Sequence, residues 1–328
     1  MQRRHPICTA LIRAAIAGAA FALATSAHAA DKFPDKPITL IVPFAPGGNL
    51  DIVARSLAPG LGAALGGTVI VENRAGAGGA VGASYVARAK PDGTTLMVST
   101  PNALVVSPLI TTTNYQLESF TPIGTISTTP LTIVVGPKSP FTTIQALLAE
   151  ARAKPGKLTV GHSGNGTTNH VALLQLESDA KLDFTIVPYK GSGPALTDLM
   201  GGQTDLMFAT PQSVVSLIKS GKLRALAVSA GKRLAVMPEV PTIGESGYAG
   251  FEAVDWKALV APAGTPADVV KALNDAVNKA LGQPSTIAEL LADGSAPMGG
   301  TPEQAAQKIK AEYARWGALI REAGIKLE

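Results

Sequence analysis

A pair of glycines at the end of an apolar run is the first place where residue types and spacing suggest binding chemistry. The run ITLIVPF (38–44) leads into APGGN (45–49), and a helical pattern begins at about Leu50, with Asn49 placed to cap it. Because glycine has no side chain, backbone N–H groups can approach an anion closely, and the start of a helix adds partial positive charge. We therefore predict an anion-binding loop around Gly47, Gly48 and Asn49. The alternative is an ordinary strand-to-helix turn.

A second loop, GHSGNGTTNH (161–170), follows the same logic. A strand is expected to end at about Val160, and Thr167 or Thr168 is expected to open a helix. Hydroxyl, amide and backbone donors are concentrated here without a carboxylate, as hydrogen-bonded recognition of an anion requires. The predicted ligand residues are Ser163, Gly164, Asn165, Gly166, Thr167 and Thr168. A third strand-to-helix loop, ENRAGAGG (72–79), contains Arg74, either a ligand cation or an exposed loop arginine.

Catalytic and cofactor motifs are incomplete. GAGGAVG (76–82) has Val81 where the dinucleotide fingerprint ends in glycine, and no Gly-Lys pair is followed by Ser or Thr as in a phosphate-binding P-loop. GHSGN has Asn165 where the hydrolase elbow G-x-S-x-G has its last glycine. We therefore expect no cofactor and no enzyme activity.

Titratable residues do not form a recognisable catalytic or metal-binding cluster. His162 and His170 lack metal-ligand spacing, so hydrogen-bonded structural roles are expected. The acidic side chains Asp51, Asp198 and Asp205 stand alone rather than as an acid–base pair. We expect no bound metal.

Further ligand contacts are predicted at Asp51, Thr100, Tyr189 and Asp205. For Tyr189, which ends a strand before Gly191, a glycine turn is the equally favoured alternative. Trp256 lies in an apolar run and is expected in the core.

The amino-terminal 30 residues carry an export signal. Three basic residues, Arg3, Arg4 and Arg13, precede an apolar stretch that runs from Ala14 to Ala24. Ala27-His28-Ala29 then forms an A-x-A site. This pattern is typical of a cleaved secretory signal peptide, and the apolar stretch is too short to span a membrane. We predict a signal peptide at 1–29 and a periplasmic mature protein.

Removal of that segment changes the charge balance. The 28 basic residues fall to 25 against 24 acidic ones, and the only cysteine, Cys8, is lost. A nearly neutral chain with 5% aromatic residues does not favour nucleic acid or an acidic membrane surface as a partner. The mature protein has no disulfide and no thiol nucleophile.

Short β-branched runs alternate with alanine-rich helical patterns along the chain, which predicts an α/β fold with right-handed crossovers and parallel-rich sheets flanked by helices. The predicted strands are 38–44, 68–73, 95–100, 131–135, 157–162, 184–189, 204–209 and 223–229. The predicted helices are 50–65, 79–89, 143–153, 167–179, 192–200, 211–220, 266–281, 284–293 and 302–323. Thr265-Pro266 and Thr301-Pro302 place a capping residue before a proline at the first helical position.

At 328 residues the chain is long enough for two domains. Glycine and proline punctuation near 121–130 and 229–241 marks where it could cross between them. We predict a discontinuous first domain (30–127 plus 236–328) and an inserted second domain (128–235), with a hinge near 127–131 and 229–236.

Several segments together resemble one family. FAPGGNLDIVAR (44–55), VIVENRAGAGGAVGA (69–83), GHSGNGTTNHVA (161–172), VPYKGSGPALTDLMGGQTDLMF (187–208) and VDWKALVAPAGTP (254–266) look like the Bug family of extracytoplasmic receptors of tripartite tricarboxylate transporters. The resemblance covers essentially the whole mature chain, in the family's order.

The resemblance implies a two-lobed periplasmic binding protein, type II-like, with its ligand cleft between the lobes. It implies that the first two loops hold the carboxylate of a small organic acid, amino acid or aromatic acid, largely through backbone amides and ordered water. The corresponding residues here are Phe44, Gly47, Gly48 and Asn49 in the first loop and Ser163 to Thr168 in the second. The expected receptor is a monomer that delivers this ligand to membrane permease subunits. Asp51 and Arg55 fit the family's D-x-x-x-R helix start, with capping or ion pairing the alternative to ligand contact.

Departures from the family pattern lie where selectivity is set. Asn49-Leu50 is bulkier than expected after the double glycine, and Ala209-Thr210-Pro211 replaces a more polar stretch. Two alternatives stay open: an orphan receptor that acts through a sensor partner, and an exported α/β hydrolase that uses Ser163 with His162 or His170.

Overall fold

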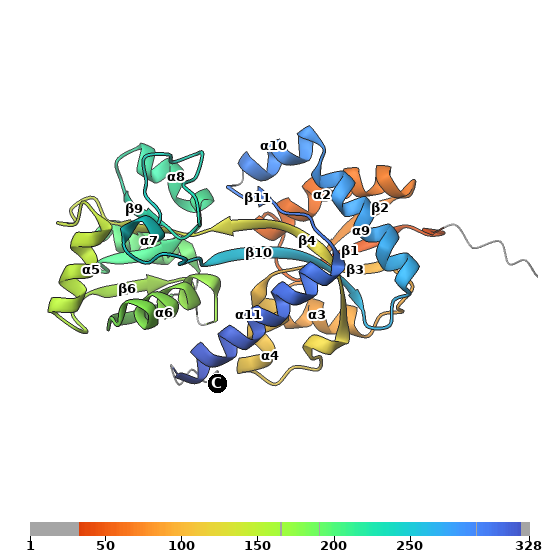
Figure 1. Cartoon of the computed structure of the whole chain (residues 1–328), viewed down its shortest axis with the longest axis horizontal. Coiled ribbons are helices and arrows are strands. Elements are labelled where there is room, and N and C mark those ends of the chain that lie inside the picture. The colour runs from red at the N-terminus through yellow and green to blue at the C-terminus, as the bar shows by residue number, and fades with distance from the viewer. Residues whose placement is uncertain (1–32, 165, 190, 293, 323–328) are drawn as a thin grey trace, which may run out of the picture.

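The computed structural model describes residues 33–164, 166–189, 191–292 and 294–322. It has two lobes, each built on its own β-sheet with helices packed around it (Figure 1). The predicted signal peptide and Asn165 lie outside the described residues. No helix in the described part of the chain combines the length and hydropathy that a membrane span needs.

The first lobe contains a six-stranded mixed sheet in the order β11-β4-β10-β3-β1-β2. Strands β1, β2 and β3 are mutually parallel, whereas β10 is antiparallel to both of its neighbours, β3 and β4. The strand bounds are β1 Ile38–Val42, β2 Val69–Asn73, β3 Thr95–Ser99, β4 Phe120–Pro130, β10 Val254–Pro262 and β11 Ala296–Pro297.

The second lobe contains a five-stranded sheet in the order β7-β6-β8-β5-β9. Strands β7, β6 and β8 are parallel, but β5 is antiparallel to both of its neighbours. The strand bounds are β5 Thr132–Val135, β6 Thr159–His162, β7 Thr185–Pro188, β8 Leu206–Ala209 and β9 Arg224–Val228.

Helices cover both sheets, and apolar side chains from the two layers form the cores. The helices are α2 Asn49–Leu65, α3 Ala80–Ala87, α4 Ser107–Ile110, α5 Ile144–Ala153, α6 Thr168–Ala180, α7 Ser192–Gly201, α8 Pro211–Lys219, α9 Ala267–Leu281, α10 Pro284–Ala292 and α11 Pro302–Glu322. Short turns of helix are η1 Ala77–Gly79, the π-helical η2 Asn102–Val106, η3 Leu117–Ser119 and η4 Gly244–Ser246.

The predicted α/β fold is confirmed, with every predicted strand and helix present to within about two residues. The sequence missed strands β4, β10 and β11, the helical segment from Asn102 to Ile110 and the short turns η3 and η4. Strand β4 contains Pro122 and four threonines, so it lacks the apolar run by which the other strands were found. The expectation of parallel strands was wrong for β5, since burial on both faces does not fix strand direction.

Helix capping agrees with the sequence at one position and differs at another. Thr301 Oγ1 accepts from the Gln304 N–H, and Gln304 Oε1 accepts from the Thr301 N–H, which forms a capping box before α11. Before α9, however, Pro266 itself is the N-cap residue rather than the first helical residue. The Thr265 hydroxyl instead donates to the Pro262 carbonyl at 2.8 Å.

Strands β4 and β10 lie side by side and connect the two lobes (Figure 1). The chain enters the second sheet after Pro130, and it returns to the first sheet only at Val254. Between these points Ile243 and Phe251 pack into the core of the second lobe. The chain therefore returns to the first lobe later than the predicted residue 236. The glycines and prolines near 229–241 lie in loops that still belong to the second lobe and pack beside β9. The Ile243 N–H donates to the Val228 carbonyl at 2.9 Å.

Candidate functional site

The double-glycine loop joins β1 to the amino end of α2. Gly47 has φ +80°, a left-handed conformation that favours glycine, and Gly48 is the N-cap residue in extended conformation. Asn49 is the first residue of the helix, so the expectation that it caps α2 is wrong. A glycine N-cap has no side chain, and the first turn of α2 is left open to an approaching group.

The Asp51 side chain fixes the backbone of this loop through hydrogen bonds. Its buried carboxylate accepts from the Gly47 N–H at 2.9 Å, from Arg55 Nε at 3.0 Å and from Asn73 Nδ2 at 2.9 Å. Burial by itself raises the pKa of Asp51, but these hydrogen bonds outweigh it and hold the pKa below its ordinary value. Asn73 also donates to the Phe44 carbonyl at 3.1 Å. Asp51 therefore ion-pairs and positions the loop, one of the two alternatives the sequence left open.

The second loop joins β6 to α6, which begins at Thr168 with Thr167 as its N-cap residue. The Thr167 hydroxyl donates to the Gly164 carbonyl at 2.7 Å, and the Ser163 hydroxyl donates to Asn169 Oδ1 at 3.1 Å. Gly164 and Gly166 both have positive φ, +130° and +72°. The hydroxyls thus fold the loop on itself, and the first N–H groups of α6 have no carbonyl partner within the helix.

Two histidines fix the backbone of this second loop. His162 Nδ1 accepts from the Gly164 N–H and His170 Nδ1 accepts from the Gly166 N–H, both at 3.2 Å. Burial lowers the pKa of both rings, that of His170 to about 4. Both are therefore neutral near pH 7. The expected structural role of the histidines is confirmed, and no group of three or more potential metal ligands occurs among the described residues.

The predicted loops meet a third glycine loop around Asn102. The Asn102 Nδ2 group donates to the Gly78 carbonyl at 3.0 Å, and a Cβ placed on Gly166 would lie 3.7 Å from Asn102 Oδ1. In the same way, a Cβ on Gly79 would lie 3.2 Å from the ring of Phe44. Loops from both lobes thus converge on one amide side chain.

Sequence reasoning missed Asn102 because nothing in its spacing distinguishes it from a surface asparagine. It begins the π-helical turn η2, and such turns often occur at functional positions. That turn can be seen only in the backbone.

The arginines near these loops are engaged elsewhere. Arg55 pairs with Asp51, while Arg74 contacts Glu72 Oε1 at 2.7 Å and lies 3.6 Å above the ring of Tyr85. Arg74 is therefore a half-buried, ion-paired side chain rather than an exposed loop arginine, and its buried Nε has no hydrogen-bond partner among the described residues. The described parts of the loops offer an anion hydrogen-bond donors and helix amino ends.

Thr100 and Tyr189, two of the further predicted ligand contacts, lie in different surroundings. Thr100 is buried at the end of β3, and its hydroxyl has no hydrogen-bond partner in the described structure, so it can serve a ligand. The Tyr189 hydroxyl donates to Asp198 Oδ2 at 2.7 Å, and burial together with this carboxylate raises its pKa to about 12.

Asp205 is not brought to the site. It accepts from the Thr159 N–H at 2.7 Å, where β6 and β8 begin, whereas the ligand loop follows the other end of β6. Trp256 is fully buried in the core, as expected.

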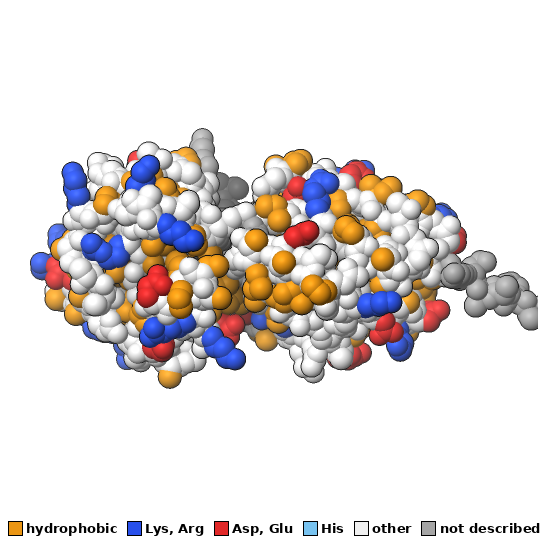
Figure 2. All heavy atoms as spheres, turned by 90° about the horizontal axis from the view of Figure 1, so that it is seen from above, with side chains coloured by type: hydrophobic (Ala, Val, Ile, Leu, Met, Phe, Trp, Pro, Cys, Tyr) orange, Lys and Arg blue, Asp and Glu red, His pale blue; other side chains and the backbone are white. Residues whose placement is uncertain are grey.

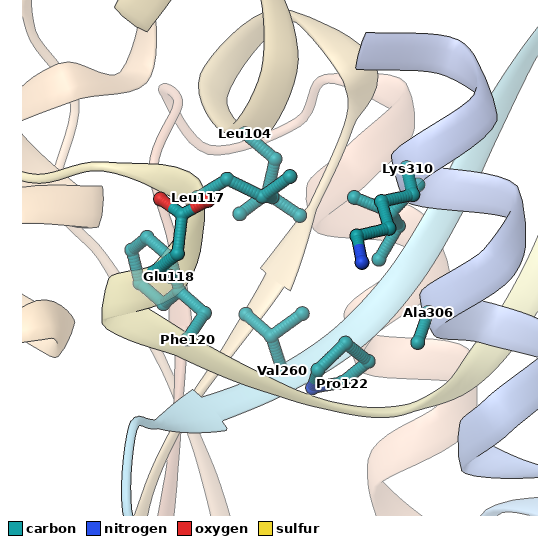
Figure 3. Close-up of a pocket in the computed structure, with 9 residues that line it drawn as sticks. Leu104, Leu117, Glu118, Phe120, Pro122, Val260, Ala306 and Lys310 are labelled. Carbon is teal, nitrogen blue, oxygen red and sulfur yellow. The ribbon is translucent and has the colours of Figure 1, made fainter. Parts of the chain in front are cut away.

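A separate apolar cavity of about 200 Å³ lies within the first lobe, between η2, β4, β10 and α11. Leu104, Phe120 and Val260 line it, and Glu118 and Lys310 lie on opposite sides (Figure 3). None of the glycine loops contributes to its wall, so this cavity is separate from the loops described above.

Residues 53–325 match the family described as the tripartite tricarboxylate transporter family receptor, TctC. The chain belongs to this family. Among its curated relatives, BugT of Bordetella pertussis is 38% identical over 91% of this chain and 93% of its own. A protein encoded between tcbD and tcbE in Pseudomonas sp. strain P51 is 39% identical over 94% of both chains.

Solved structures of similar receptors share the fold. The periplasmic binding protein BugD is 34% identical with a TM-score of 0.74, covering 90% of this chain and 100% of its own. Rpa4515 of R. palustris, solved with adipate, is 35% identical with a TM-score of 0.77, covering 90% of this chain and 99% of its own. MatC of Rhodopseudomonas palustris, with bound malate, is 34% identical with a TM-score of 0.71 over 88% and 100%. The protein is thus a solute-binding receptor with the two-lobed periplasmic fold that the sequence predicted.

Proposed function

We propose that this receptor captures a small carboxylate between its lobes and delivers it to membrane permease subunits. The observation that carries the proposal is the convergence of glycine loops from both lobes on Asn102. The proposed ligand residues are Phe44, Gly47, Gly48, Asn49, Ser163 to Thr168 and Thr100, joined by Asn102. Tyr189 contributes at the edge through its ring or backbone.

Helix dipoles and neutral donors explain how an anion is held without a fixed counter-charge. The amino ends of α2 and α6 supply partial positive charge and N–H donors, and hydrogen bonds strengthen where water is excluded. The Gly47 N–H is already bonded to Asp51, so Gly48 and the first turn of α2 are the donors of the first loop. Such a site recognises any carboxylate, and the rest of the cleft selects among them.

The relatives narrow the ligand class. One similar receptor was solved with adipate and another with malate, both dicarboxylates. We propose a small organic acid of this kind for the present protein. Figure 2 shows acidic and basic side chains interspersed on the visible face, with no single basic surface suited to nucleic acid.

A periplasmic location, export by the signal peptide at 1–29, and a monomeric state belong to the same proposal. Family membership supports the periplasm and a transporter permease as partner. Sensing in place of transport uses the same site, and no specific feature of the fold favours it.

The proposal excludes hydrolysis. Ser163 donates its hydroxyl to Asn169 and not to an imidazole nitrogen, and each histidine Nδ1 already accepts a backbone N–H. These contacts do not provide the nucleophile–base pair that acyl transfer needs.

Thermal-shift screening against mono-, di- and tricarboxylates, followed by calorimetry, tests the proposal. A ligand at 100 times its dissociation constant stabilises the folded protein by about 2.7 kcal/mol. We expect 1:1 binding of at least one carboxylate and no turnover of a model ester. Ester turnover that disappears in Ser163→Ala would instead establish a hydrolase.

A further inference from the structure

A fully buried cation lies in one of the two strands that connect the lobes. The Lys257 side chain of β10 is 0% exposed, with its Nζ 3.1 Å from Asp255 Oδ2 and 2.5 Å from Thr129 Oγ1. A buried ammonium group costs several kcal/mol of desolvation and persists only with well-placed partners. Lys257 thus joins the neighbouring strands β10 and β4 through their side chains.

The second oxygen of Asp255 reaches the predicted ligand loop. Thr168, the first residue of α6, donates its hydroxyl to Asp255 Oδ1 at 3.2 Å. Asp255 therefore contacts two groups at once: the amino end of α6 in the second lobe and the ammonium of Lys257 in the connecting strand.

The network continues past β4 into the first lobe. Because Lys257 can only donate, Thr129 Oγ1 accepts from it, and the hydroxyls of Thr129 and Ser295 share a hydrogen bond at 2.7 Å. Ser295 precedes β11 at the edge of the first sheet. A continuous polar chain therefore runs from α6 through both connecting strands to the first lobe.

Lys257 also lies where the connecting strands bend. Lys257 pairs with Ser127, but the next residue, Ala258, pairs with Thr125, which leaves a β-bulge in β4. A bulge bends and twists a strand pair locally. The polar chain therefore crosses the connection at a point suited to a change in lobe orientation.

We propose that Asp255 and Lys257 are positioning residues that tie the first turn of α6 to the bulge in β4, so that lobe orientation and the ligand loop change together. This inference rests on the proposed function for its purpose, but the coupling itself exists without ligand. Rotation of the second lobe about the bulge stretches the Thr168–Asp255 contact or moves the first turn of α6 with it. When the lobes close, the hydrogen-bond donors in the first turn of α6 are thereby moved into position.

The test compares variants that break the chain at two points. Thr168→Val removes the hydroxyl at one end and keeps the branched shape. The double variant Asp255→Asn, Lys257→Met removes the ion pair while leaving an acceptor for Thr168, and such neutral replacements of a buried pair commonly fold well. Thr197→Val, which removes a hydroxyl bonded to Gly193 in α7, is the matched control.

Two measurements on the ligand-free protein read out the coupling. The first is amide hydrogen exchange in the first turn of α6. The second is the distance distribution between spin labels on the exposed residues Lys219 and Gln307, substituted by cysteine with Cys8→Ser. We expect exchange at least about fivefold faster, together with a broader distribution, in both variants but not in the control.

The proposal is overturned if either variant leaves the hydrogen exchange or the distance distribution unchanged. The first turn of α6 and the bulge in β4 would then behave independently. An ion pair that only stabilises the fold lowers the unfolding temperature without changing the lobe distance distribution. Because neither readout uses a carboxylate, failure of the coupling is distinguishable from failure of the proposed binding function.

Discussion

The imidazole rings of His162 and His170 stack on each other with their centroids 4.2 Å apart and their planes 11° from parallel. One ring comes from the last residue of β6 and the other from the first turn of α6. Each Nδ1 accepts an N–H from the loop between them, at Gly164 and Gly166. The shape of the loop between β6 and α6 therefore depends on both rings being neutral.

Acid is expected to destabilise the protein through this pair. Burial, and then the charge of His162, lowers the pKa of His170 to about 4, below its ordinary 6.5. The unfolded chain thus binds protons more readily between these values, so stability is complete above pH 6.5 and falls as the pH drops toward 4. The loss from His170 is at most about 3 kcal/mol. Urea unfolding between pH 7.5 and 4 measures it.

His170→Phe is the control for this prediction. It keeps a stacked ring but does not titrate, so its stability should fall less over the same pH range, although it loses the bond to Gly166. A pH dependence equal to that of the wild type would show that other groups cause the acid loss.

Gly48→Ala is expected to weaken carboxylate binding with little effect on folding. Gly48 has φ −78°, and an added Cβ meets only the Ala45 carbonyl at 3.6 Å, an ordinary contact. The methyl group instead obstructs the N–H groups at the start of α2. We expect affinity for the carboxylate identified by the thermal-shift screen to fall about tenfold or more, an effect of about 1.4 kcal/mol measured by calorimetry.

Gly231→Ala is the matched control, because its added Cβ has no atom within 4 Å. Equal affinities for wild type and Gly48→Ala would show that the double-glycine turn serves only the fold.

Gly166→Ala is expected to force the lobes apart. Its Cβ would lie 2.7 Å from Ile110 Cδ1 and 3.0 Å from Val106 Cγ1, and both of those side chains belong to the first lobe. Small-angle scattering should show a larger radius of gyration than in the wild type. The added Cβ also strains the backbone at φ +72°, so the clash must be separated from the strain.

Ile110→Ala makes that separation, because it removes the methyl group in closest contact. The double variant Gly166→Ala, Ile110→Ala should recover most of the wild-type radius while keeping the backbone strain. A radius that stays large would assign the effect to strain in the loop and not to the contact between the lobes.

Asp51→Asn is expected to lower stability and loosen the first loop. The carboxylate accepts from Gly47, Arg55 and Asn73, and an amide cannot accept all three bonds or balance Arg55. Loss of charged hydrogen bonds at a buried site costs about 1–3 kcal/mol, measurable by denaturant unfolding. Glu72→Gln, which breaks the exposed pair with Arg74, should change stability by less than about 1 kcal/mol.

The sequence by itself determined the local elements and the chemistry of the loops. Apolar β-branched runs such as 38–42 form strands, and GGN and GNGTT after strands produce helix amino ends, because these preferences act between residues close in the chain. The same local reasoning predicted hydrogen-bonded structural roles for His162 and His170 and, from its apolar run, the burial of Trp256.

Only the tertiary structure decided which distant residues meet. Strand β4 lacks an apolar run because it is stabilised by pairing with β10 along its whole length, and the return to the first lobe at Val254 follows from packing of Phe251. Asp205 hydrogen-bonds to Thr159 at the start of β6, whereas the glycine loop follows the other end of that strand. The pairing register of β6 and β8 decides which end Asp205 lies at. The partners of Asp51 at Asn73, of Asn102 at Gly78 and of Lys257 at Thr129 are set by the three-dimensional packing of separate segments, which local spacing in the chain does not encode.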